Sequence, residues 1–384
     1  MSPRALLSFG NFLSGGHFFL IIYIIGPYLA TFMSDDAAGL VISLGAVVTL
    51  AVFPWMPSLV RRFGSRNIAL ALAFLQAVML LLLAANPIPV FAAGLLALVC
   101  ATAPFIAYQL DLLLEATVRE EGSTGRIRTA FLTASSVAVI LAPLLIGAIL
   151  GDGSDYRGVF LAASLSLTPF IMLFLFERPQ EGAPPRISRL SATCICIMND
   201  KDLRSVTFAH AMLQVFYNLA PLYIPLYLHT VLGMPWSDLG WLLAFALLPF
   251  VFLEYPAGWI ADRFIGDKEM LVAGFLIMGG AFALVPLITL ATPLAAVFGI
   301  LLLTRVGAAI TEAMVEGHFF RRVDERDAST VSVIRMMRPA GALVAPLVGS
   351  ILLATTGYGT LFISTGIAIA LLGTWAALGM QDIR

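Results

Sequence analysis

Between two long apolar stretches the chain reads Gly258-Trp-Ile-Ala-Asp262-Arg263-Phe264-Ile-Gly266-Asp-Lys268. A basic segment that aligns with it lies 201 residues earlier and reads Pro57-Ser-Leu-Val-Arg61-Arg62-Phe63-Gly64-Ser-Arg66. At the same offset, Asp111 aligns with Glu312 and Glu115 aligns with Glu316, and all four residues lie within apolar stretches. Internal repetition of this length is typical of membrane proteins built from two similar halves. The sequence therefore predicts two copies of one structural unit.

The composition excludes most soluble classes of protein. Of the 384 residues, 60% are hydrophobic and 12% are charged, whereas a soluble protein is roughly 25% charged. So few charges cannot cover the surface of a soluble domain, and a net charge of −1 gives no attraction to nucleic acid. We therefore predict an integral membrane protein that is surrounded by lipid and has no nucleic-acid partner.

Twelve apolar stretches are long enough to cross a bilayer, which takes about 20 residues in a helix. Their length favours helices over the strands of a barrel, so the predicted fold is an all-α membrane protein with twelve transmembrane helices. The stretches cover residues 5–33, 37–60, 67–86, 88–117, 127–150, 156–176, 203–231, 236–262, 269–290, 293–320, 328–354 and 358–379. The longest connection predicts a six-helix bundle over 1–176, a cytoplasmic linker over 177–203 and a second six-helix bundle over 204–384.

The basic residues predict the orientation, because Lys and Arg stay preferentially in cytoplasmic loops. With the N-terminus inside, 18 of the 22 basic residues fall in cytoplasmic segments, only Arg157 falls outside, and the other three lie within spans: Arg305, Arg335 and Arg338. We therefore expect both termini in the cytoplasm and the chain in a cell membrane, which in a bacterium is the inner membrane.

The segment 258–268 resembles the loop signature of the major facilitator superfamily, with one extra residue before its second glycine. The likeness is carried by Gly258, Asp262, Arg263, Gly266 and Lys268. The first-half segment departs from the signature, with Pro57 for the glycine and Arg61 for the aspartate. It keeps Arg62 and Gly64. The resemblance implies a secondary transporter with two pseudo-symmetric six-helix bundles around a cavity that opens alternately to either side.

Ionisable side chains inside apolar stretches are costly unless they are paired or neutralised, which makes each one a functional candidate. The first half has intramembrane acids but no intramembrane arginine, so we expect Asp111 to take up protons and Glu115 to relay them. Glu312 and His17 are further proton-coupling candidates. The alternatives are that Asp111 lies beside water or a polar neighbour and that His17 is a hydrogen-bonded packing residue.

A second set of charges lies toward the cytoplasmic ends of spans eight, ten and eleven: Glu254, Glu312, Glu316, Arg335 and Arg338. Two interpretations stay open. The set is either a structural ion-pair cluster or a polar gate whose members change partners during transport.

The resemblance implies that spans one, four, seven and ten line the cavity. Polar and aromatic cavity candidates on these spans are Asn11, Tyr23, His210, Gln214, Tyr217, Asn218 and Arg305. Those of span seven recur at helical spacing and predict one polar, aromatic stripe, which suits an amphipathic solute. Aromatic residues near span ends also act as interface anchors, which is the alternative interpretation.

The leading expectation is proton-coupled export of a small amphipathic solute by a monomer. Ala142-Pro143 and Ala345-Pro346 resemble the glycine–proline signature of drug and metabolite proton antiporters, with alanine for glycine. The alternatives are proton-coupled uptake of a small polar or anionic metabolite, which intramembrane arginines would bind, and a non-transporting receptor or scaffold. The sequence has no nucleotide-binding glycine loop and no zinc-protease or nucleophile motif. We therefore expect no enzymatic activity, no cofactor and no metal.

Overall fold

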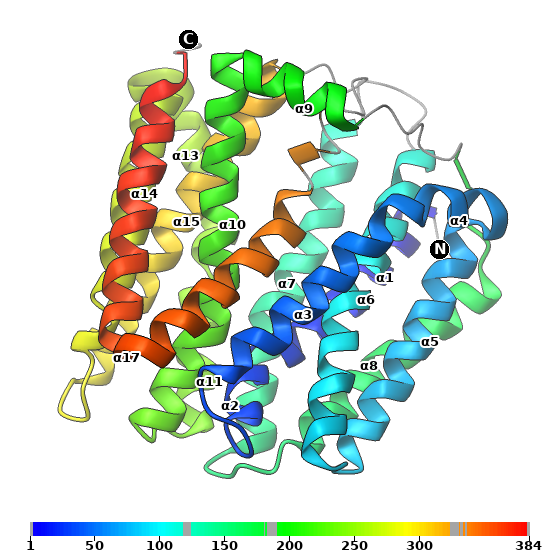
Figure 1. The fold of residues 1–384 in the computed structure, drawn as a ribbon. Helices are drawn as coiled ribbons and strands as arrows, with labels where there is room; N and C mark the ends of the chain where they lie inside the picture. The colour runs from blue at the N-terminus through cyan, green and yellow to red at the C-terminus, as the bar shows by residue number, and fades with distance from the viewer. Residues whose placement is uncertain are drawn as a thin grey trace. The chain divides into compact units, whose positions relative to one another are not determined.

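The computed structural model describes residues 3–117, 124–179, 181–182, 190–322, 330, 333–334 and 336–381. Over these ranges the chain consists of helices and short connections, without a strand, which confirms the predicted all-α fold. It divides into two compact units (Figure 1). Unit 1 comprises Met1–Pro185 and Leu228–Ala244, and unit 2 comprises Arg186–Tyr227 and Phe245–Arg384. The predicted linker over 177–203 stays a prediction.

Unit 1 is organised around α1. Its helices are α1 (Pro3–Ile22), α2 (Ile25–Leu29), α3 (Ala37–Val52), α4 (Met56–Phe63), α5 (Ser65–Ala84), α6 (Pro89–Thr117), α7 (Thr124–Leu150), α8 (Arg157–Phe176) and most of α11 (Trp236–Ala246). Helix α1 packs against α6, α7 and α8, whereas α5 packs against α6 and α8, and α3 against α6. Helix α11 joins this unit because Gly240 lies against Gly147 of α7, where a Cβ on Gly240 would be 2.7 Å from the Pro143 carbonyl oxygen.

Unit 2 repeats the packing order of unit 1. Its helices are α9 (Leu190–Asn199), α10 (Lys201–Leu226), α12 (Pro249–Phe252), α13 (Glu254–Ile260), α14 (Asp267–Ala283), α15 (Leu294–Arg322) and α17 (Met337–Gly379). Helix α10 packs against α15 and α17, α14 packs against the same two helices, and α13 packs against α15. Thus α10 takes the place of α1, α14 that of α5 and α13 that of α3.

The two aligned segments quoted first end in the same backbone turn. Gly64 follows α4 with φ 79° and precedes α5, and Gly266 follows the π-helical turn Ala261–Ile265 with φ 108° and precedes α14. A positive φ is strained for residues with a Cβ, so glycine is required at both places. The alignment of the two segments therefore reflects a shared turn between consecutive helices.

The number of spans agrees with the predicted twelve. Within the described residues, 10 single helices are long and apolar enough to cross a membrane, and a pair bent by 43°, Trp236–Phe252 and Pro256–Ile265, is an eleventh. The last of these helices, α17, has 43 residues and contains Gly357 with the non-helical φ of 83°, which divides it into two stretches. The predicted spans eleven and twelve meet at this break. The break in span eight follows from Pro249 and Pro256, which cannot donate a backbone hydrogen bond.

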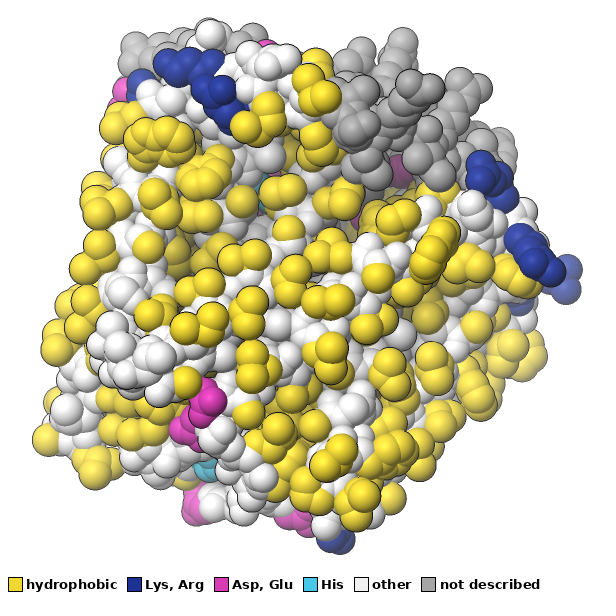
Figure 2. All heavy atoms as spheres, viewed as in Figure 1, with side chains coloured by type: hydrophobic (Ala, Val, Ile, Leu, Met, Phe, Trp, Pro, Cys, Tyr) yellow, Lys and Arg dark blue, Asp and Glu magenta, His cyan; other side chains and the backbone are white. Residues whose placement is uncertain are grey.

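The outer surface is apolar. Figure 2 shows hydrophobic side chains over most of the visible face and Lys and Arg side chains near its edges. On α17, for example, Leu371 and Trp375 are 62% and 66% exposed. Helices that are apolar on the outside as well as the inside belong in lipid, since water would not tolerate such a surface. The chain is a multi-pass membrane protein.

Candidate functional site

Polar side chains form a stripe along α10 in unit 2. Gln214 Nε2 lies 3.2 Å from His210 Nε2, and Asn218 Nδ2 donates to the Gln214 carbonyl oxygen at 2.8 Å. His210 and Gln214 are buried, and Asn218 is half-buried. Successive members are four residues apart, which places them on one helix face. An amide nitrogen only donates, so Gln214 requires an acceptor nitrogen on His210.

Tyr217 joins this helix to α15. Its hydroxyl donates a hydrogen bond to Glu312 Oε2, and both side chains are half-buried. Glu316 lies one turn further along α15 and is also half-buried. The structure thus brings a predicted cavity residue into contact with a predicted proton-coupling residue. Within the described residues, the Tyr217 hydroxyl is the hydrogen-bond partner of the Glu312 carboxyl group.

Arg305 lies on α15 two helical turns before Glu312. It is 4% exposed, and its guanidinium carbon lies 5.2 Å from the centre of the Phe216 ring on α10. A guanidinium group over an aromatic face is stabilised by the ring's negative face. The arginine is therefore held inside unit 2 next to the stripe.

In unit 1, the polar centre is formed by His17 and a residue that sequence analysis missed, Gln76 on α5. The Thr102 hydroxyl donates to the Leu98 carbonyl oxygen at 2.7 Å, so it accepts from Gln76 Nε2 at 3.0 Å. Gln76 Nε2 also donates to the Val99 carbonyl oxygen at 3.2 Å. These bonds turn Gln76 Oε1 toward His17 Nε2, which it contacts. His17 Nε2 must then carry the proton.

The second nitrogen of His17 is thereby left as a base. His17 is 1% exposed, and its Nδ1 has no hydrogen-bond partner among the described residues. Buried polar atoms without a partner are uncommon and often mark a functional place. The sequence feature that could have identified Gln76 as a functional candidate is its position as a neutral polar residue within the apolar stretch of span three.

We expect Gln76→Leu to destabilise the chain, because it leaves the His17 N–H without an acceptor, at a cost of about 1–3 kcal/mol. Gln109→Leu is the matched control. Gln109 is also fully buried, but its Oε1 has no partner within the described residues and its Nε2 reaches only Met56 Sδ at 3.8 Å. Thermal unfolding of the purified variants should give a lower Tm for Gln76→Leu and an unchanged or higher Tm for Gln109→Leu. Equal losses would contradict the network.

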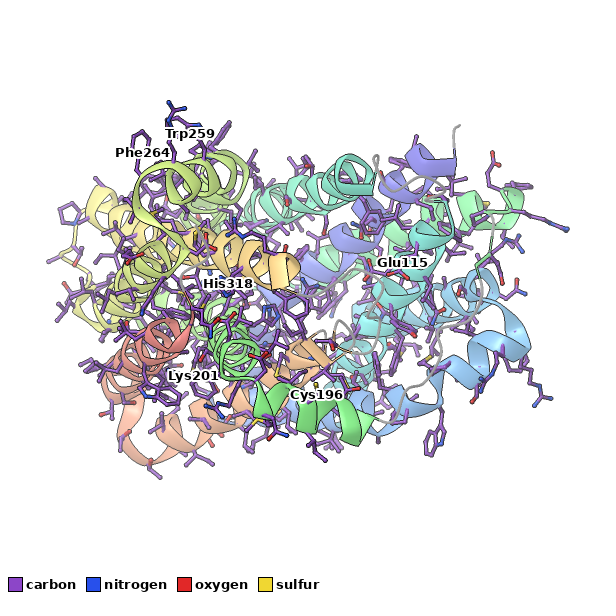
Figure 3. The ribbon with its side chains drawn as sticks, turned by 90° about the horizontal axis from the view of Figure 1, so that it is seen from above. Glu115, Cys196, Lys201, Trp259, Phe264 and His318 are labelled. Atoms are coloured by element: carbon purple, nitrogen blue, oxygen red, sulfur yellow. The ribbon has the colours of Figure 1, made fainter. Side chains whose placement is uncertain are left out.

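The remaining unit 1 candidates lie on α1, directly after it, and on α6. Asn11 Nδ2 donates to the Phe131 carbonyl oxygen at 2.8 Å and so ties α1 to α7. Tyr23 is buried at 3% exposure. On α6, Asp111 is half-buried and Glu115 is exposed. Figure 3 labels Glu115 on this helix.

The predicted gate lies partly outside the described residues. Arg335 and the side chain of Glu254 are not described, and Arg338 is exposed. In the loop signature the side chain of Asp262 is likewise not described, and Lys268 is half-buried. Arg263 lies over the exposed rings of Trp259 and Phe264, at 5.9 and 6.0 Å (Figure 3). In the first-half segment, Arg61 donates to Ser58 Oγ at 3.1 Å and Arg62 lies 5.2 Å from the centre of the Phe63 ring.

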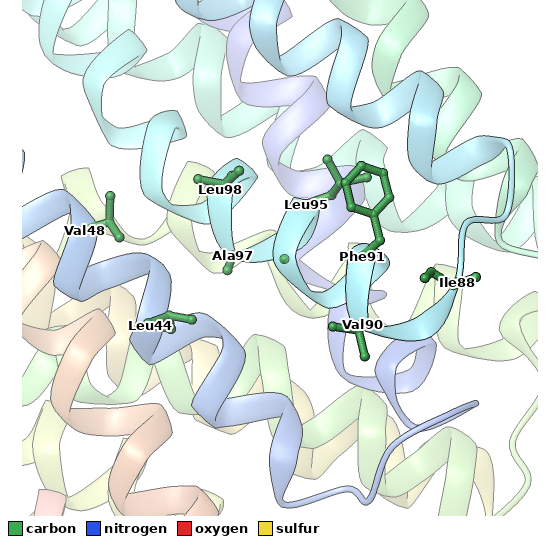
Figure 4. Close-up of a pocket in the computed structure, with 9 residues that line it drawn as sticks. Leu44, Val48, Ile88, Val90, Phe91, Leu95, Ala97 and Leu98 are labelled. Atoms are coloured by element: carbon green, nitrogen blue, oxygen red, sulfur yellow. The ribbon is translucent and has the colours of Figure 1, made fainter.

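A groove of about 610 Å³ lies between α3 and α6 in unit 1 (Figure 4). Its walls are formed entirely by apolar residues: Leu44, Val48, Ile88, Val90, Phe91, Gly94, Leu95, Ala97 and Leu98. Such a lining offers no hydrogen bond to a polar group and suits a lipid acyl chain. The groove is therefore not a candidate for the solute site.

Comparison with known proteins agrees with this architecture. The family model described as Major Facilitator Superfamily matches residues 7–315 and 206–381. An uncharacterized MFS-type transporter of Mycobacterium tuberculosis, present in strains CDC 1551 and H37Rv, is 31% identical over 139 residues, which is 36% of this chain. That stretch is 32% of the relative's length, so the match spans about a third of the curated relatives.

Solved structures share the whole fold. A bacterial homolog of the human lysosomal transporter Spinster, in an inward-facing and occupied conformation, has a TM-score of 0.74 at 15% identity. The similarity covers 98% of this chain and 95% of that one. A variant of the nucleoside transporter NupG has a TM-score of 0.76 at 12% identity and 98% coverage of both chains. At such identities the likeness concerns the fold alone.

Proposed function

Because the chain belongs to the Major Facilitator Superfamily, we propose that it exports a small amphipathic solute in exchange for protons. The observation that carries this proposal is the contact between Tyr217 on α10 and Glu312 on α15. A carboxylate inside a membrane-spanning helix is costly as an anion, and it becomes inexpensive when it binds a proton. A tyrosine hydroxyl can bond either form of the carboxyl group, because it both donates and accepts. Glu312 is thus proposed to bind and release the transported proton.

The surroundings of this pair favour an amphipathic solute. The Phe250 ring lies 6.0 Å from the Tyr217 ring, and Phe216 precedes Tyr217 on the same helix. Apolar rings beside the amides of Gln214 and Asn218 provide both apolar contact and directed hydrogen bonds. We propose this stripe as one wall of the solute site.

In unit 1 we propose His17 as a second proton acceptor. Its Nδ1 is buried and has no partner among the described residues, and Gln76 fixes the tautomer that presents the lone pair there.

Asp111, with Glu115 as a relay, remains the carboxyl candidate of this unit. The charged set around Glu316 and Arg338 remains a proposed gate, and the monomer remains a proposal.

Arg305 favours a second candidate function, the uptake of a small anionic metabolite together with protons. It is buried beside the stripe, and a guanidinium group is a strong partner for carboxylate or phosphate. In the first proposal, the same group orders the aromatic wall through Phe216.

Binding of solutes to the purified chain distinguishes the two functions. A ligand at a hundredfold excess over its Kd stabilises the folded protein by about 2.7 kcal/mol, so thermal unfolding should be followed across amphipathic compounds and organic anions. We expect amphipathic compounds to raise the Tm. Asn218→Ala should remove this effect, whereas Asn67→Ala, at an exposed amide on α5, should keep it. Stabilisation by anions alone would favour uptake.

The native cysteines test the proposed orientation of the chain, in which α9 lies on the cytoplasmic side of the membrane. Cys194 and Cys196 on α9 are exposed, whereas Cys100 is half-buried. A membrane-impermeant maleimide is expected to label Cys194 and Cys196 in inside-out vesicles and not in right-side-out vesicles. Cys194→Ala combined with Cys196→Ala is the control for labelling at Cys100. Labelling from the outside would contradict a cytoplasmic α9.

A further inference from the structure

His318 lies near the end of α15 (Figure 3), and its two ring nitrogens each lie near a carboxyl group. Its Nε2 is 3.0 Å from Asp202 Oδ2, and its Nδ1 is 3.3 Å from Asp267 Oδ2. The side chains of His318 and Asp202 are 0% exposed, and that of Asp267 is 5% exposed. Asp202 lies in the first turn of α10, and Asp267 is the first residue of α14. Three helices of unit 2 therefore meet at one imidazole ring.

The protonation of this ring follows from its neighbours. An ionised carboxylate only accepts hydrogen bonds, and a neutral imidazole has one donor nitrogen and one acceptor nitrogen. A neutral ring would therefore direct a lone pair at one of the two carboxylates. We propose that His318 is a buried proton-binding site, held as an imidazolium by Asp202 and Asp267. This site goes beyond the proposed function, because none of its members belongs to the stripe.

Among the described contacts, the formal charges of the proposed site cancel. Arg321, one turn beyond His318, contacts Asp267, so two cations face two anions. Asp202 Oδ1 accepts the backbone N–H of Gln381 at 2.7 Å, which attaches the segment after α17. The adjacent Lys201 is exposed and Lys268 is half-buried. Buried charges are tolerated when they are paired and hydrogen-bonded, and both oxygens of Asp202 and Oδ2 of Asp267 have such partners.

The proton at His318 fixes the ends of α10, α14 and α15 to one another. Without it, the neutral ring would direct a lone pair at Asp202 or at Asp267, and one of the two contacts that join the three helix ends would be lost. Helices α10 and α15 also carry Tyr217 and Glu312. The site therefore fixes the relative position of the two helices that form the proposed coupling pair.

Nitrogen NMR of the full chain in liposomes tests the protonation directly. The chain has 4 histidines, so selective ¹⁵N-histidine labelling gives few signals. The variants His17→Gln, His210→Gln and His229→Gln each remove the signals of one histidine. The signals that remain in all three variants belong to His318, which is unchanged in each of them. At pH 7.5, an unperturbed imidazole is mostly neutral. We expect two protonated nitrogens on His318. One protonated and one bare nitrogen on His318 would overturn the proposal.

Thermal unfolding gives a second test with a defined order. His318→Gln removes the cation between two carboxylates, whereas His318→Gln combined with Asp202→Asn removes one charge of each sign. Leaving a buried charge unpaired is more destabilising than removing both partners. We therefore expect the double variant to have a higher Tm than His318→Gln alone, and His229→Gln to be the control for histidine replacement. Additive losses from the two substitutions would show that no imidazolium is held at this place.

Discussion

Glu312→Gln is expected to abolish the accumulation of solute driven by a pH gradient in proteoliposomes, reducing it to the background of empty liposomes. Glutamine has nearly the same size as glutamate, and its side-chain oxygen still accepts from the Tyr217 hydroxyl that contacts Glu312. It cannot bind or release a proton. The variant should therefore lose the coupling to protons while it keeps the solute site.

Exchange of labelled for unlabelled solute at equal pH separates these two properties. Glu312→Gln should still exchange solute, since exchange needs no net movement of protons. The matched control is Glu269→Gln, at an exposed glutamate on α14, which should keep both activities. If Glu312→Gln retained gradient-driven accumulation, Glu312 would not be the coupling residue, and Asp111 or His17 would take its place.

Gly279→Ala is expected to lower the Tm of the chain strongly, whereas Gly280→Ala should raise it slightly. A Cβ on Gly279 of α14 would lie 2.4 Å from the Gly366 carbonyl oxygen on α17, and a Cβ on Gly280 would have nothing within 4 Å. Overpacking of this kind costs about 1–3 kcal/mol because the backbones must separate. Alanine in a helix without such a contact is favoured over glycine by about 0.5–1 kcal/mol.

Gly279 and Gly280 serve as controls for each other, because both are glycines at neighbouring positions of the same helix. The measurement is thermal unfolding of both purified variants under the same conditions. A similar Tm for both would mean that α14 and α17 do not approach each other as closely as Gly279 and Gly366 imply.

Apolar length and repetition were sufficient to predict the fold. The helices α6 and α15, of 29 residues each, lie where long apolar stretches predicted spans four and ten. The paired turns at Gly64 and Gly266 explain why the two quoted segments align. The break of span eight at Pro249 and Pro256 was harder to predict from the sequence, because a proline within a span bends some helices and is accommodated in others.

The helix stripe was predictable from spacing, whereas the partners across helices were not. His210 and Gln214 are four residues apart, so helical geometry brings them together. Asp202 and His318 are 116 residues apart, and only the packing of α10 on α15 joins them. Gln76 has no charge and therefore did not attract attention as an intramembrane residue, although His17 depends on it. Contacts between helices are decided by packing, which sequence periodicity does not encode.

The flux of an identified solute into proteoliposomes under pH gradients of both signs tests the proposed exchange most directly. In exchange for protons, the solute moves opposite to them and accumulates in the acidic compartment, whereas joint transport with protons accumulates it in the alkaline one. Empty liposomes correct for the passive trapping of weak bases, and a protonophore should abolish the remainder. We predict accumulation in the acidic compartment. Accumulation in the alkaline compartment, or flux that does not depend on the gradient, would contradict proton-coupled export.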